Sequence, residues 1–277
     1  MITQSIHKAY DFSDQIAVVT GGAGVLCAEM CRSVASAGAK IAILDINPDA
    51  AESIAIDINS KGGEALILIC DVLDKVSIEL AARQIIESFG RVDMLINGAG
   101  GNSPQATTKG DLSFFDLPED AIRWVMDLNL MGTILSCQVF GKFMAQQKKG
   151  IILNISSMNA FRPLSRIPAY SAAKAGVSNF TQWLAVHMAR EYAPEIRVNA
   201  IAPGFFLTDQ NRYLLTDKVT GSLTPRGQSI LDHTPMGRFG TPDDLIGTVL
   251  WLLSPASDFI TGVVVPIDGG FSAYSGV

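Results

Sequence analysis

Tyr170 and Lys174 are the pair of residues whose types and spacing most clearly suggest chemistry. Four residues apart in a helix, their side chains share one face, one turn apart. A free phenol has a pKa of about 10, which is too high for a good base near neutrality. A neighbouring ammonium favours the phenolate and lowers that pKa. The pair therefore predicts proton transfer to or from an alcohol or ketone oxygen.

Two further polar residues, Ser157 and Asn129, suit the same chemistry. A Tyr-x-x-x-Lys pair alone often occurs by chance, so these neighbours strengthen the prediction. Ser157 ends a strand-like run before the Tyr170 helix, and its hydroxyl can donate to a substrate oxygen where charge develops. Asn129, in the helix before that run, could hold a water behind Lys174 in a proton relay. We predict Asn129, Ser157, Tyr170 and Lys174 as the catalytic residues.

Short β-branched runs alternate with longer amphipathic stretches along most of the chain. The strand-like runs are Ile16–Thr20, Lys40–Leu44, Leu66–Cys70, Met94–Ile96, Ile151–Ile155, Arg197–Ile201 and Val263–Pro266. The helical stretches are Leu26–Ala37, Pro48–Lys61, Val76–Phe89, Glu119–Lys148, Ala169–Tyr192 and Pro242–Leu253. The runs are nearly continuous in apolar residues, as expected when helices cover both faces of a parallel sheet. This pattern predicts a single α/β domain over residues 1–277, a doubly wound parallel sheet flanked by helices.

Three segments lie outside this alternation. Residues 1–13 are polar, lack the apolar region of a secretory signal, and are predicted to be an N-terminal extension. Residues 101–118 and 205–235 are long excursions that follow strand-like runs. Such excursions at the carboxyl ends of parallel strands often build substrate sites, so 205–235 is predicted to be a substrate-loop insertion. The alternative is an ordinary variable loop.

A glycine-rich turn at residues 20–26 joins the first strand-like run to the first helix. Glycines there allow a close approach to a pyrophosphate, and the following helix offers unpaired N–H groups. Asp45 ends the second run, where a carboxylate can accept hydrogen bonds from ribose hydroxyls and repel a 2′-phosphate. No Arg or Lys follows directly, so NAD(H) is favoured over NADP(H). The alternative is that Asp45 only caps the next helix.

The predicted cofactor site uses the ends of the first four strand-like runs. Its residues are Gly21, Gly24, Val25, Leu26, Asp45, Ile46, Asp71, Val72, Asn97, Gly98, Ala99 and Gly100. Asp71 is well placed to contact an adenine ring. The small residues after Asn97 let that strand pass close under a cofactor.

Together these motifs resemble those of the short-chain dehydrogenase/reductase family, over about residues 13–270. They are the glycine-rich turn, Asp71, Asn97–Gly100, Asn129, Ser157, Tyr170, Lys174, Asn199, Pro203-Gly204 and Asp268–Gly270. The resemblance implies a Rossmann-like fold with a seven-stranded parallel sheet, and a homotetramer or homodimer. It implies that Tyr170 and Lys174 also contact the cofactor. It further implies that a segment after the sixth strand borders the nicotinamide, namely Pro203, Gly204, Phe206 and Thr208.

The glycine-rich turn departs from the family pattern Thr-Gly-x-x-x-Gly-x-Gly. Val25 and Cys27 stand where the last two glycines fall, and Gly24 can replace one of them. Cys27 implies either looser packing of the helix on the strand or a compensating small neighbour. The departure bears on the affinity for the cofactor and leaves the predicted fold unchanged.

Residues beside the catalytic set suggest a sugar-acid substrate. Asn159 and Arg162 lie just beyond the catalytic serine, and Arg212 lies in the 205–235 segment. Arginine forks suit carboxylates, and amides suit sugar hydroxyls. We predict these three residues as substrate-binding, with a structural salt bridge as the alternative for each arginine.

The sequence of these active-site flanks is similar to that of the D-mannonate oxidoreductases (fructuronate reductases) within the short-chain family. The similarity implies interconversion of D-mannonate and D-fructuronate. A gluconate-like or polyol dehydrogenase is the alternative within the same enzyme class. A third hypothesis is an NAD-binding regulatory protein without turnover, but such proteins typically lose the tyrosine or the lysine.

Composition limits the other functions. The formal charge of −6 argues against an electrostatic hold on nucleic acid or anionic lipid. No apolar run approaches the roughly 18 residues needed to span a bilayer, so we expect a cytoplasmic protein. The four cysteines fit no metal spacing, and Cys27 and Cys31 are expected to be buried free thiols. His187 and Glu191 alone make a poor metal site, so no metal is predicted.

Arg238 is expected to form a salt bridge, and His233 is a further candidate for substrate contact.

Overall fold

The computed structural model describes residues 8–207, 212–217 and 220–276. Within them, seven strands form one sheet in the order β3-β2-β1-β4-β5-β6-β7, with every neighbouring pair parallel. The strands are β1 (Ile16–Thr20), β2 (Lys40–Asp45), β3 (Ala65–Ile69), β4 (Met94–Asn97), β5 (Gly150–Ile155), β6 (Ile196–Pro203) and β7 (Val264–Ile267). The predicted doubly wound parallel sheet is confirmed.

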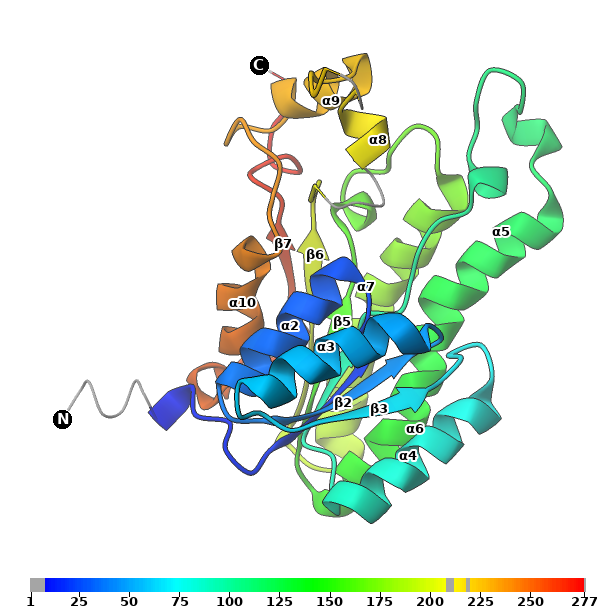
Figure 1. The fold of residues 1–277 in the computed structure, drawn as a ribbon. Coiled ribbons are helices and arrows are strands. Elements are labelled where there is room, and N and C mark those ends of the chain that lie inside the picture. The colour runs from blue at the N-terminus through cyan, green and yellow to red at the C-terminus, as the bar shows by residue number, and fades with distance from the viewer. Residues whose placement is uncertain (1–7, 208–211, 218–219, 277) are drawn as a thin grey trace.

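Helices cover both faces of this sheet (Figure 1). One face carries α2 (Val25–Ser36), α3 (Pro48–Ser60) and α10 (Asp243–Leu253). The other face carries α4 (Lys75–Phe89), α6 (Gly132–Gln147) and α7 (Pro168–Glu191). Each set packs on the sheet around its own apolar cluster, as in a three-layer α/β domain. None of the helices described is long and apolar enough to cross a membrane.

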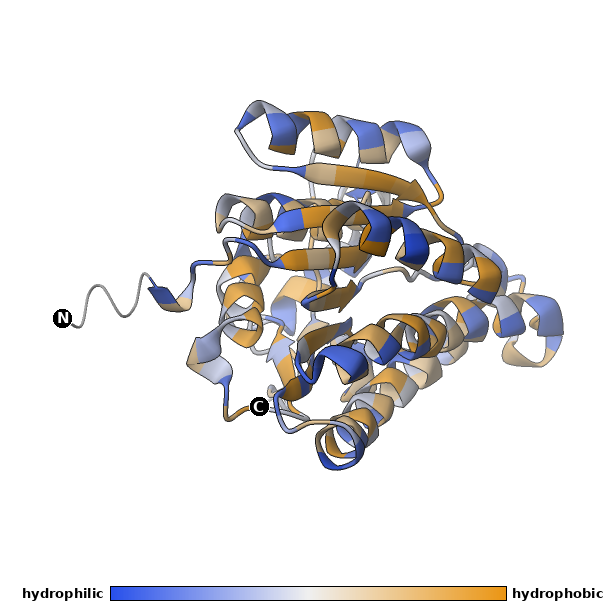
Figure 2. Cartoon of the chain, turned by 90° about the horizontal axis from the view of Figure 1, so that it is seen from below, coloured by the Kyte–Doolittle hydropathy of each residue, from blue (hydrophilic) through white to orange (hydrophobic). Residues whose placement is uncertain are grey.

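The strands form the apolar centre of the domain. Every residue of β1 and β6 is buried. Figure 2 shows strands that are mainly hydrophobic, with hydrophilic residues spread along the surrounding helices. Because both faces of the sheet are covered, neither side of a central strand meets water, which explains the nearly continuous apolar runs in the sequence.

The strand order reverses between β1 and β4, because β2 and β3 are added on one side and β4 to β7 on the other. In open parallel sheets, ligands bind at the carboxyl ends of the strands beside such a point. Thr20 at the end of β1 pairs with Asn97 of β4, and Asn97 pairs with Asn154 of β5. These strand ends carry the predicted cofactor and catalytic segments.

The helix predicted over Glu119–Lys148 is interrupted. The chain forms α5 (Glu119–Met126), one π-helical turn (Asp127–Met131) and then α6. Asn129 lies in the π turn, and its Nδ2 donates to the Val125 carbonyl oxygen at 2.8 Å. This side-chain bond competes with the regular backbone bonds. π turns within helices are often found at functional sites.

The predicted insertion 205–235 contains short helices that we did not predict. These are α8 (Arg212–Leu215) and α9 (Pro225–Asp232). Thr224 caps α9, since its Oγ1 accepts from the Gly227 N–H at 3.0 Å, and Pro225 follows at the first helical position. A Thr-Pro start of this kind is a readable helix signal.

The predicted N-terminal extension contributes to the core. Phe12 is fully buried, and its N–H donates to the Ala37 carbonyl oxygen at 2.7 Å. Ala37 follows the last residue of α2, so this contact joins the segment before β1 to the end of α2. Residues 1–7 of the extension lie outside the described residues.

Candidate active site

Tyr170 and Lys174 lie in the first turns of α7, which begins at Pro168. Lys174 is only 4% exposed, and its Nζ lies 5.6 Å from the centre of the Tyr170 ring. The Nζ donates a 2.7 Å hydrogen bond to the Ile155 carbonyl oxygen at the end of β5. The structure therefore brings the predicted pair together at the carboxyl end of a central strand.

Ser157 lies beside this pair, close enough to Tyr170 for its hydroxyl to affect the pKa of the phenol. Loss of hydration raises the pKa of the Tyr170 phenol above its ordinary value, and the nearby Ser157 hydroxyl lowers it by a smaller amount. Burial also lowers the pKa of Lys174 to about 8. Burial thus outweighs the predicted effect of the ammonium on the phenol. Near neutrality the chain alone holds a neutral phenol beside a mostly charged ammonium.

Asn129 is fully buried and lies across Gly100 from Lys174. Its Oδ1 accepts from the Gly101 N–H at 3.1 Å, and its Nδ2 donates to the Gly101 carbonyl oxygen at 2.7 Å. A Cβ added at Gly100 would lie 2.7 Å from Asn129 Oδ1 and 3.3 Å from Lys174 Nζ. Glycine therefore keeps the space between these two polar groups open. The relay water itself stays a prediction.

A buried polar network fixes α7 against the sheet beneath the candidate catalytic pair. Asn97 Nδ2 donates to Asn154 Oδ1 at 2.8 Å, and Asn154 Nδ2 donates to Thr181 Oγ1 at 2.9 Å. Ser156 Oγ donates to the Lys174 carbonyl oxygen at 3.1 Å. Because buried polar groups need partners, these bonds oppose sliding of α7 along the sheet. The Nδ2 of Asn97 is thus engaged within the protein.

The glycine-rich turn packs closely on the segment after β4. Gly21 has a φ of +61°, and an added Cβ would lie 2.7 Å from the Ala99 backbone. The Ala99 N–H donates to Thr20 Oγ1 at 3.3 Å. Gly24 precedes the first residue of α2, Val25, and provides no side-chain cap. The first-turn N–H groups of α2 are therefore suited to binding an anion.

Asp45, at the end of β2, supports this turn through its carboxylate. Its Oδ2 accepts from the Ala23 N–H at 2.9 Å, and its Oδ1 accepts from the Asn47 N–H at 3.0 Å. Asn47 is the residue that caps α3, by accepting from the Ala50 N–H. The alternative that Asp45 only caps the next helix is therefore wrong. Each carboxylate oxygen has a second lone pair for a further donor.

Gly98 is the small neighbour that compensates for Cys27. A Cβ added at Gly98 would collide with the Cys27 Sγ. The thiol is 6% exposed and fills the space that a side chain at position 98 would need. Leu26, the residue before it, packs partly buried against the same apolar core. The departure from the family glycine pattern is thus absorbed by packing between α2 and the end of β4.

The other predicted residues beside β2 and β3 follow the ends of those strands. Ile46 is 70% exposed. Asp71 Oδ1 accepts from the Leu73 N–H at 2.9 Å, which orders the turn after β3. Val72 is buried, and a Cβ added at Gly132 would lie 2.8 Å from its Cγ2. An exposed apolar residue and an ordered acidic turn are compatible with one wall of an adenosine site.

The segment after β6 holds four predicted cofactor residues. Pro203 ends β6, and the Gly204 N–H donates to the carbonyl oxygen of Ile267 in β7 at 2.9 Å. The Phe206 ring is buried, and a Cβ added at Gly240 would lie 2.7 Å from it. The Phe206 ring therefore packs against the backbone at Gly240. Thr208 lies outside the described residues.

Two of the predicted substrate residues have different surroundings. Asn159 is 5% exposed, and its amide contacts Ser157 Oγ at 3.3 Å and the Leu164 N–H at 3.2 Å. It is therefore adjacent to the candidate catalytic serine. Arg212 is exposed at the start of α8, within the predicted insertion.

Arg162, the third, contacts the C-terminal tail. Its Nε donates to the Ser272 carbonyl oxygen at 3.1 Å, and Asp268 Oδ2 accepts from the Ser272 N–H at 2.9 Å. Arg162 thus connects the loop after β5 to the tail, and Asp268 orders the tail itself. His233 also lies near this tail, with its ring centre 6.4 Å from that of Tyr274.

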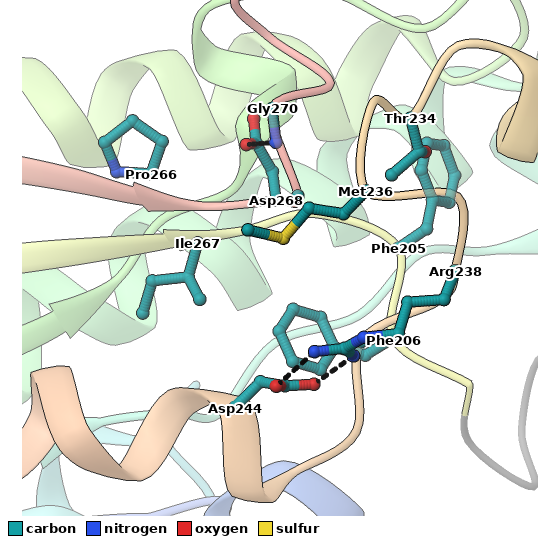
Figure 3. Close-up of a pocket in the computed structure, with 12 residues that line it drawn as sticks. Phe205, Phe206, Thr234, Met236, Arg238, Asp244, Pro266, Ile267, Asp268 and Gly270 are labelled. Atoms are coloured by element: carbon teal, nitrogen blue, oxygen red, sulfur yellow. Dashed lines mark hydrogen bonds and ion pairs between the residues drawn. The ribbon is translucent and has the colours of Figure 1, made fainter.

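A cavity of about 360 Å³ opens at the carboxyl ends of β6 and β7 (Figure 3). Phe206, Met236 and Asp268 line it, and none of the four catalytic candidates is among its lining residues. At its edge, Arg238 donates bonds of 2.6 Å and 2.7 Å to the two oxygens of Asp244. The predicted salt bridge of Arg238 is confirmed.

The remaining reactive side chains are the thiols and the groups that could ligate a metal. In the described parts of the chain, no group of three or more His, Cys, Asp or Glu residues could hold a metal ion. His187 instead stacks on Trp183, with ring centres 4.8 Å apart. All four cysteines are buried free thiols, which confirms the prediction for Cys27 and Cys31.

Comparison with known proteins identifies the family. Residues 15–218 match the model of the short chain dehydrogenase family. The chain is a short-chain dehydrogenase. The dehydrogenase is 47% identical to an uncharacterised oxidoreductase of Bacillus subtilis, over 96% of this chain and 98% of that protein.

Two solved structures are similar to this dehydrogenase throughout. A candidate D-mannonate oxidoreductase from Haemophilus influenzae with bound NAD has 47% identity and a TM-score of 0.91, covering 98% of this chain and 100% of the other. A gluconate 5-dehydrogenase from Burkholderia cenocepacia, in complex with NADP and tartrate, has 29% identity and a TM-score of 0.85, covering 97% and 99%. The family and fold implied by the sequence motifs are confirmed, and the dehydrogenase is an oxidoreductase acting on alcohol groups.

Proposed function

We propose that this dehydrogenase interconverts the secondary alcohol and ketone forms of a sugar acid with NAD(H), the pair being D-mannonate and D-fructuronate. The grouping of Ser157, Tyr170 and Lys174 at the end of β5 is the observation that carries the chemistry. The 47% identity with the NAD-bound candidate D-mannonate oxidoreductase, over nearly the whole of both chains, supports this substrate pair.

The proposed mechanism moves one proton through Tyr170. In oxidation, the phenolate oxygen takes the hydroxyl proton of the substrate, and in reduction the phenol returns it. When bound, the nicotinamide ring accepts or supplies the hydride at the reacting carbon. Ser157 donates a hydrogen bond to the substrate oxygen, where negative charge develops. The Lys174 ammonium favours the phenolate that oxidation requires. Asn129, which lies across Gly100 from Lys174, would hold a water that relays the proton.

The residues at the ends of β1, β2 and β4 fit a nicotinamide dinucleotide. Gly21 provides a close backbone approach, and the uncapped start of α2 provides N–H groups for a pyrophosphate. Asp45 would bind the ribose hydroxyls, and its charge would repel a 2′-phosphate. One similar structure contains NAD and the other NADP. The proposed preference for NAD(H) therefore rests on Asp45 of this chain.

The substrate carboxylate would be bound by Arg162 or Arg212. An arginine has five N–H donors, so the Nε bond from Arg162 to Ser272 does not exhaust them. Arg212 belongs to the segment 205–235, which we propose as the substrate loop. The dehydrogenase would act on this small molecule in the cytoplasm, without a nucleic-acid or membrane partner.

NADH oxidation with separately offered ketones tests the substrate. D-fructuronate, D-tagaturonate, 5-ketogluconate and fructose form a suitable panel, because they differ in the carboxylate and in the position of the ketone. Turnover confined to D-fructuronate is the expected result. Turnover only with fructose would remove the carboxylate from the proposal and leave a polyol dehydrogenase.

A gluconate-like dehydrogenase is the second candidate. The gluconate 5-dehydrogenase of Burkholderia cenocepacia shares 29% identity and the whole fold, which supports it less strongly than the 47% relative supports a mannonate enzyme. Turnover of 5-ketogluconate in the same panel would favour this candidate. An NAD-binding protein without turnover is disfavoured, because Asn129, Ser157, Tyr170 and Lys174 are all present.

The assembly is proposed to be a homodimer or homotetramer. A groove of about 770 Å³ runs along α6 and α7 and is lined by Phe180, Trp183, Leu184 and Met188, among others. Trp183 is 56% exposed there, next to the exposed Val186. Exposed aromatic and aliphatic patches of this kind mark protein interfaces. A second copy of the protein is the proposed occupant, as the family resemblance implies.

A further inference from the structure

The hydroxyl of Ser157 receives two hydrogen bonds from one neighbouring residue. The backbone N–H and the side-chain Nδ2 of Asn159 each lie 3.3 Å from Ser157 Oγ. Asn159 belongs to the 3-10 turn Met158–Ala160 and is 5% exposed. Both bonds are therefore buried beside the candidate catalytic oxygen.

The direction of the amide bond is fixed by Leu164. Its backbone N–H lies 3.2 Å from the Asn159 side chain, and a backbone N–H can only donate. The amide atom facing Leu164 must therefore be Oδ1. The atom facing Ser157 is then Nδ2, which can only donate.

These two donors determine where the Ser157 hydrogen can point. A serine hydroxyl has two acceptor lone pairs and a single hydrogen that rotates to suit its partners. With both lone pairs occupied by Asn159, the O–H bond must be directed at another acceptor. Tyr170 is the neighbouring group on which Ser157 acts, since Ser157 lowers the pKa of the Tyr170 phenol.

We infer that Asn159 is a positioning residue that holds the Ser157 hydroxyl as a donor toward Tyr170 and the substrate oxygen. The inference rests on the proposed function, in which Ser157 donates to the reacting oxygen. It assigns Asn159 an action through Ser157 in place of the direct substrate contact expected from the sequence. A donor already aligned before the reaction stabilises developing charge without reorganisation.

Two substitutions of Asn159 separate this role from a structural one. Asn159→Asp keeps an acceptor for Leu164 but places a second acceptor against Ser157, whose hydrogen would then turn toward the new carboxylate. Asn159→Ala removes the Leu164 bond and the Nδ2 donor but keeps the backbone donor to Ser157. Positioning predicts that Asp is the more harmful change, whereas a residue that only holds the loop predicts that Ala is.

The kinetic test measures kcat and KM for both variants, alone and combined with Ser157→Ala. We expect Asn159→Asp to lower kcat about tenfold to a hundredfold and to leave the NADH affinity unchanged. Asn159→Ala should lower kcat by a smaller factor. In the Ser157→Ala background, Asn159→Asp should add little further loss. An equal loss in both backgrounds, or a greater loss for Ala than for Asp, would overturn the inference.

A second readout needs no substrate. The phenolate absorbance of Tyr170 is obtained by subtracting the pH titration of the Tyr170→Phe protein from that of the protein with Tyr170. Asn159→Asp should raise the pKa of Tyr170, because the Ser157 donor is withdrawn, and this rise should shrink when Ser157 is alanine. A rise of the same size without the serine hydroxyl would show an effect of charge alone and contradict the positioning role.

The proposed function and this inference can fail separately. If Tyr170→Phe or Ser157→Ala retains full turnover, the proposed mechanism is wrong. If both lose turnover while Asn159→Asp keeps it, the mechanism stands and only the inference on Asn159 falls.

Discussion

Burial acts in opposite directions on the two titratable residues of the site. It raises the pKa of the Tyr170 phenol and lowers the pKa of the Lys174 ammonium to about 8. Both changes favour the neutral form, because charge is poorly hydrated there. The chain by itself is therefore prepared to donate a proton to a ketone. In the proposed mechanism, oxidation of the alcohol needs the positive charge of Lys174, which is mostly lost above about pH 8.

Cofactor binding should consequently weaken as Lys174 loses its proton. If the ammonium holds the nicotinamide ribose, the Kd for NADH is constant below about pH 7 and rises above about pH 8. NADH fluorescence titrations across this range measure it. Lys174→Arg, which stays charged, is the matched control and should remove the dependence. A wild-type Kd that is flat through pH 10.5, the ordinary lysine value, would contradict this role.

The same ionisation has the opposite sign for stability. The pKa of Lys174 is lower in the folded chain than its ordinary value of 10.5, so the unfolded state binds more protons between about pH 8 and that value. Stability from this residue therefore rises with pH over the window. A rise in the Kd for NADH above pH 8 would thus not be explained by unfolding due to the ionisation of Lys174.

We attribute the proposed preference for NAD(H) to Asp45. Asp45→Asn keeps an acceptor for the Ala23 N–H but removes the charge, so the penalty against NADPH should fall while the turn stays intact. Asp45→Arg should shift the preference further toward NADPH by pairing with the 2′-phosphate, at the expense of the Ala23 bond. Ratios of kcat/KM for the two cofactors measure both effects. A strictly NAD-dependent Asp45→Arg enzyme would count against the assigned role.

At the scale of elements, α2 packs on the end of β4 because the Cys27 side chain fills the space left by the missing side chain of Gly98. Gly98→Ala should destabilise the protein by about 1–3 kcal/mol, because the added Cβ meets the Cys27 Sγ and lies 2.9 Å from the Thr20 carbonyl oxygen. Cys27→Ala in that background should restore part of the loss, since its Cβ lies at an ordinary 3.6 Å. Thermal unfolding measures both variants. No recovery in the double variant would mean that the thiol is not the limiting contact.

Periodicity and strand ends were enough to predict the sheet and most of its helices. All seven predicted strands overlap the observed ones, because continuous apolar runs such as Arg197–Ile201 suit strands covered on both faces. The π turn at Asn129 was not predictable, since it depends on side-chain bonds to Val125 and Gly101 that form only in the folded chain. α9 was missed although Thr224-Pro225 signals its start, because the segment has few apolar residues.

The sequence predicted which residues gather at the candidate site better than it predicted the contacts that they make. Tyr170, Lys174 and Ser157 lie near one another, as their spacing indicated, while their catalytic roles stay a prediction. The tertiary partners of Asn159 and Arg162 were not readable, because Leu164 and Ser272 are brought to them by folding. The roles of Gly98 and Gly100 were the hardest to predict, because they depend on the side chains that pack against these glycines in the folded chain.

At the scale of the whole molecule, the groove along α6 and α7 should control assembly. Trp183→Glu places a charge in the proposed interface and should shift a dimer or tetramer toward smaller species. Phe259→Glu changes another exposed aromatic residue, which is not among those lining the groove, and should leave the assembly unchanged. Analytical ultracentrifugation measures both. An unaltered mass for Trp183→Glu would place the interface elsewhere.

Tyr170→Phe tests the central claim most directly, because it removes one hydroxyl and leaves the ring in place. With D-fructuronate and NADH, kcat should fall at least about a hundredfold, since the phenol is the proposed proton donor. NADH fluorescence titration should give nearly the wild-type Kd, which shows that the cofactor site is intact. Turnover close to that of the wild type, with the cofactor still bound, would contradict the account.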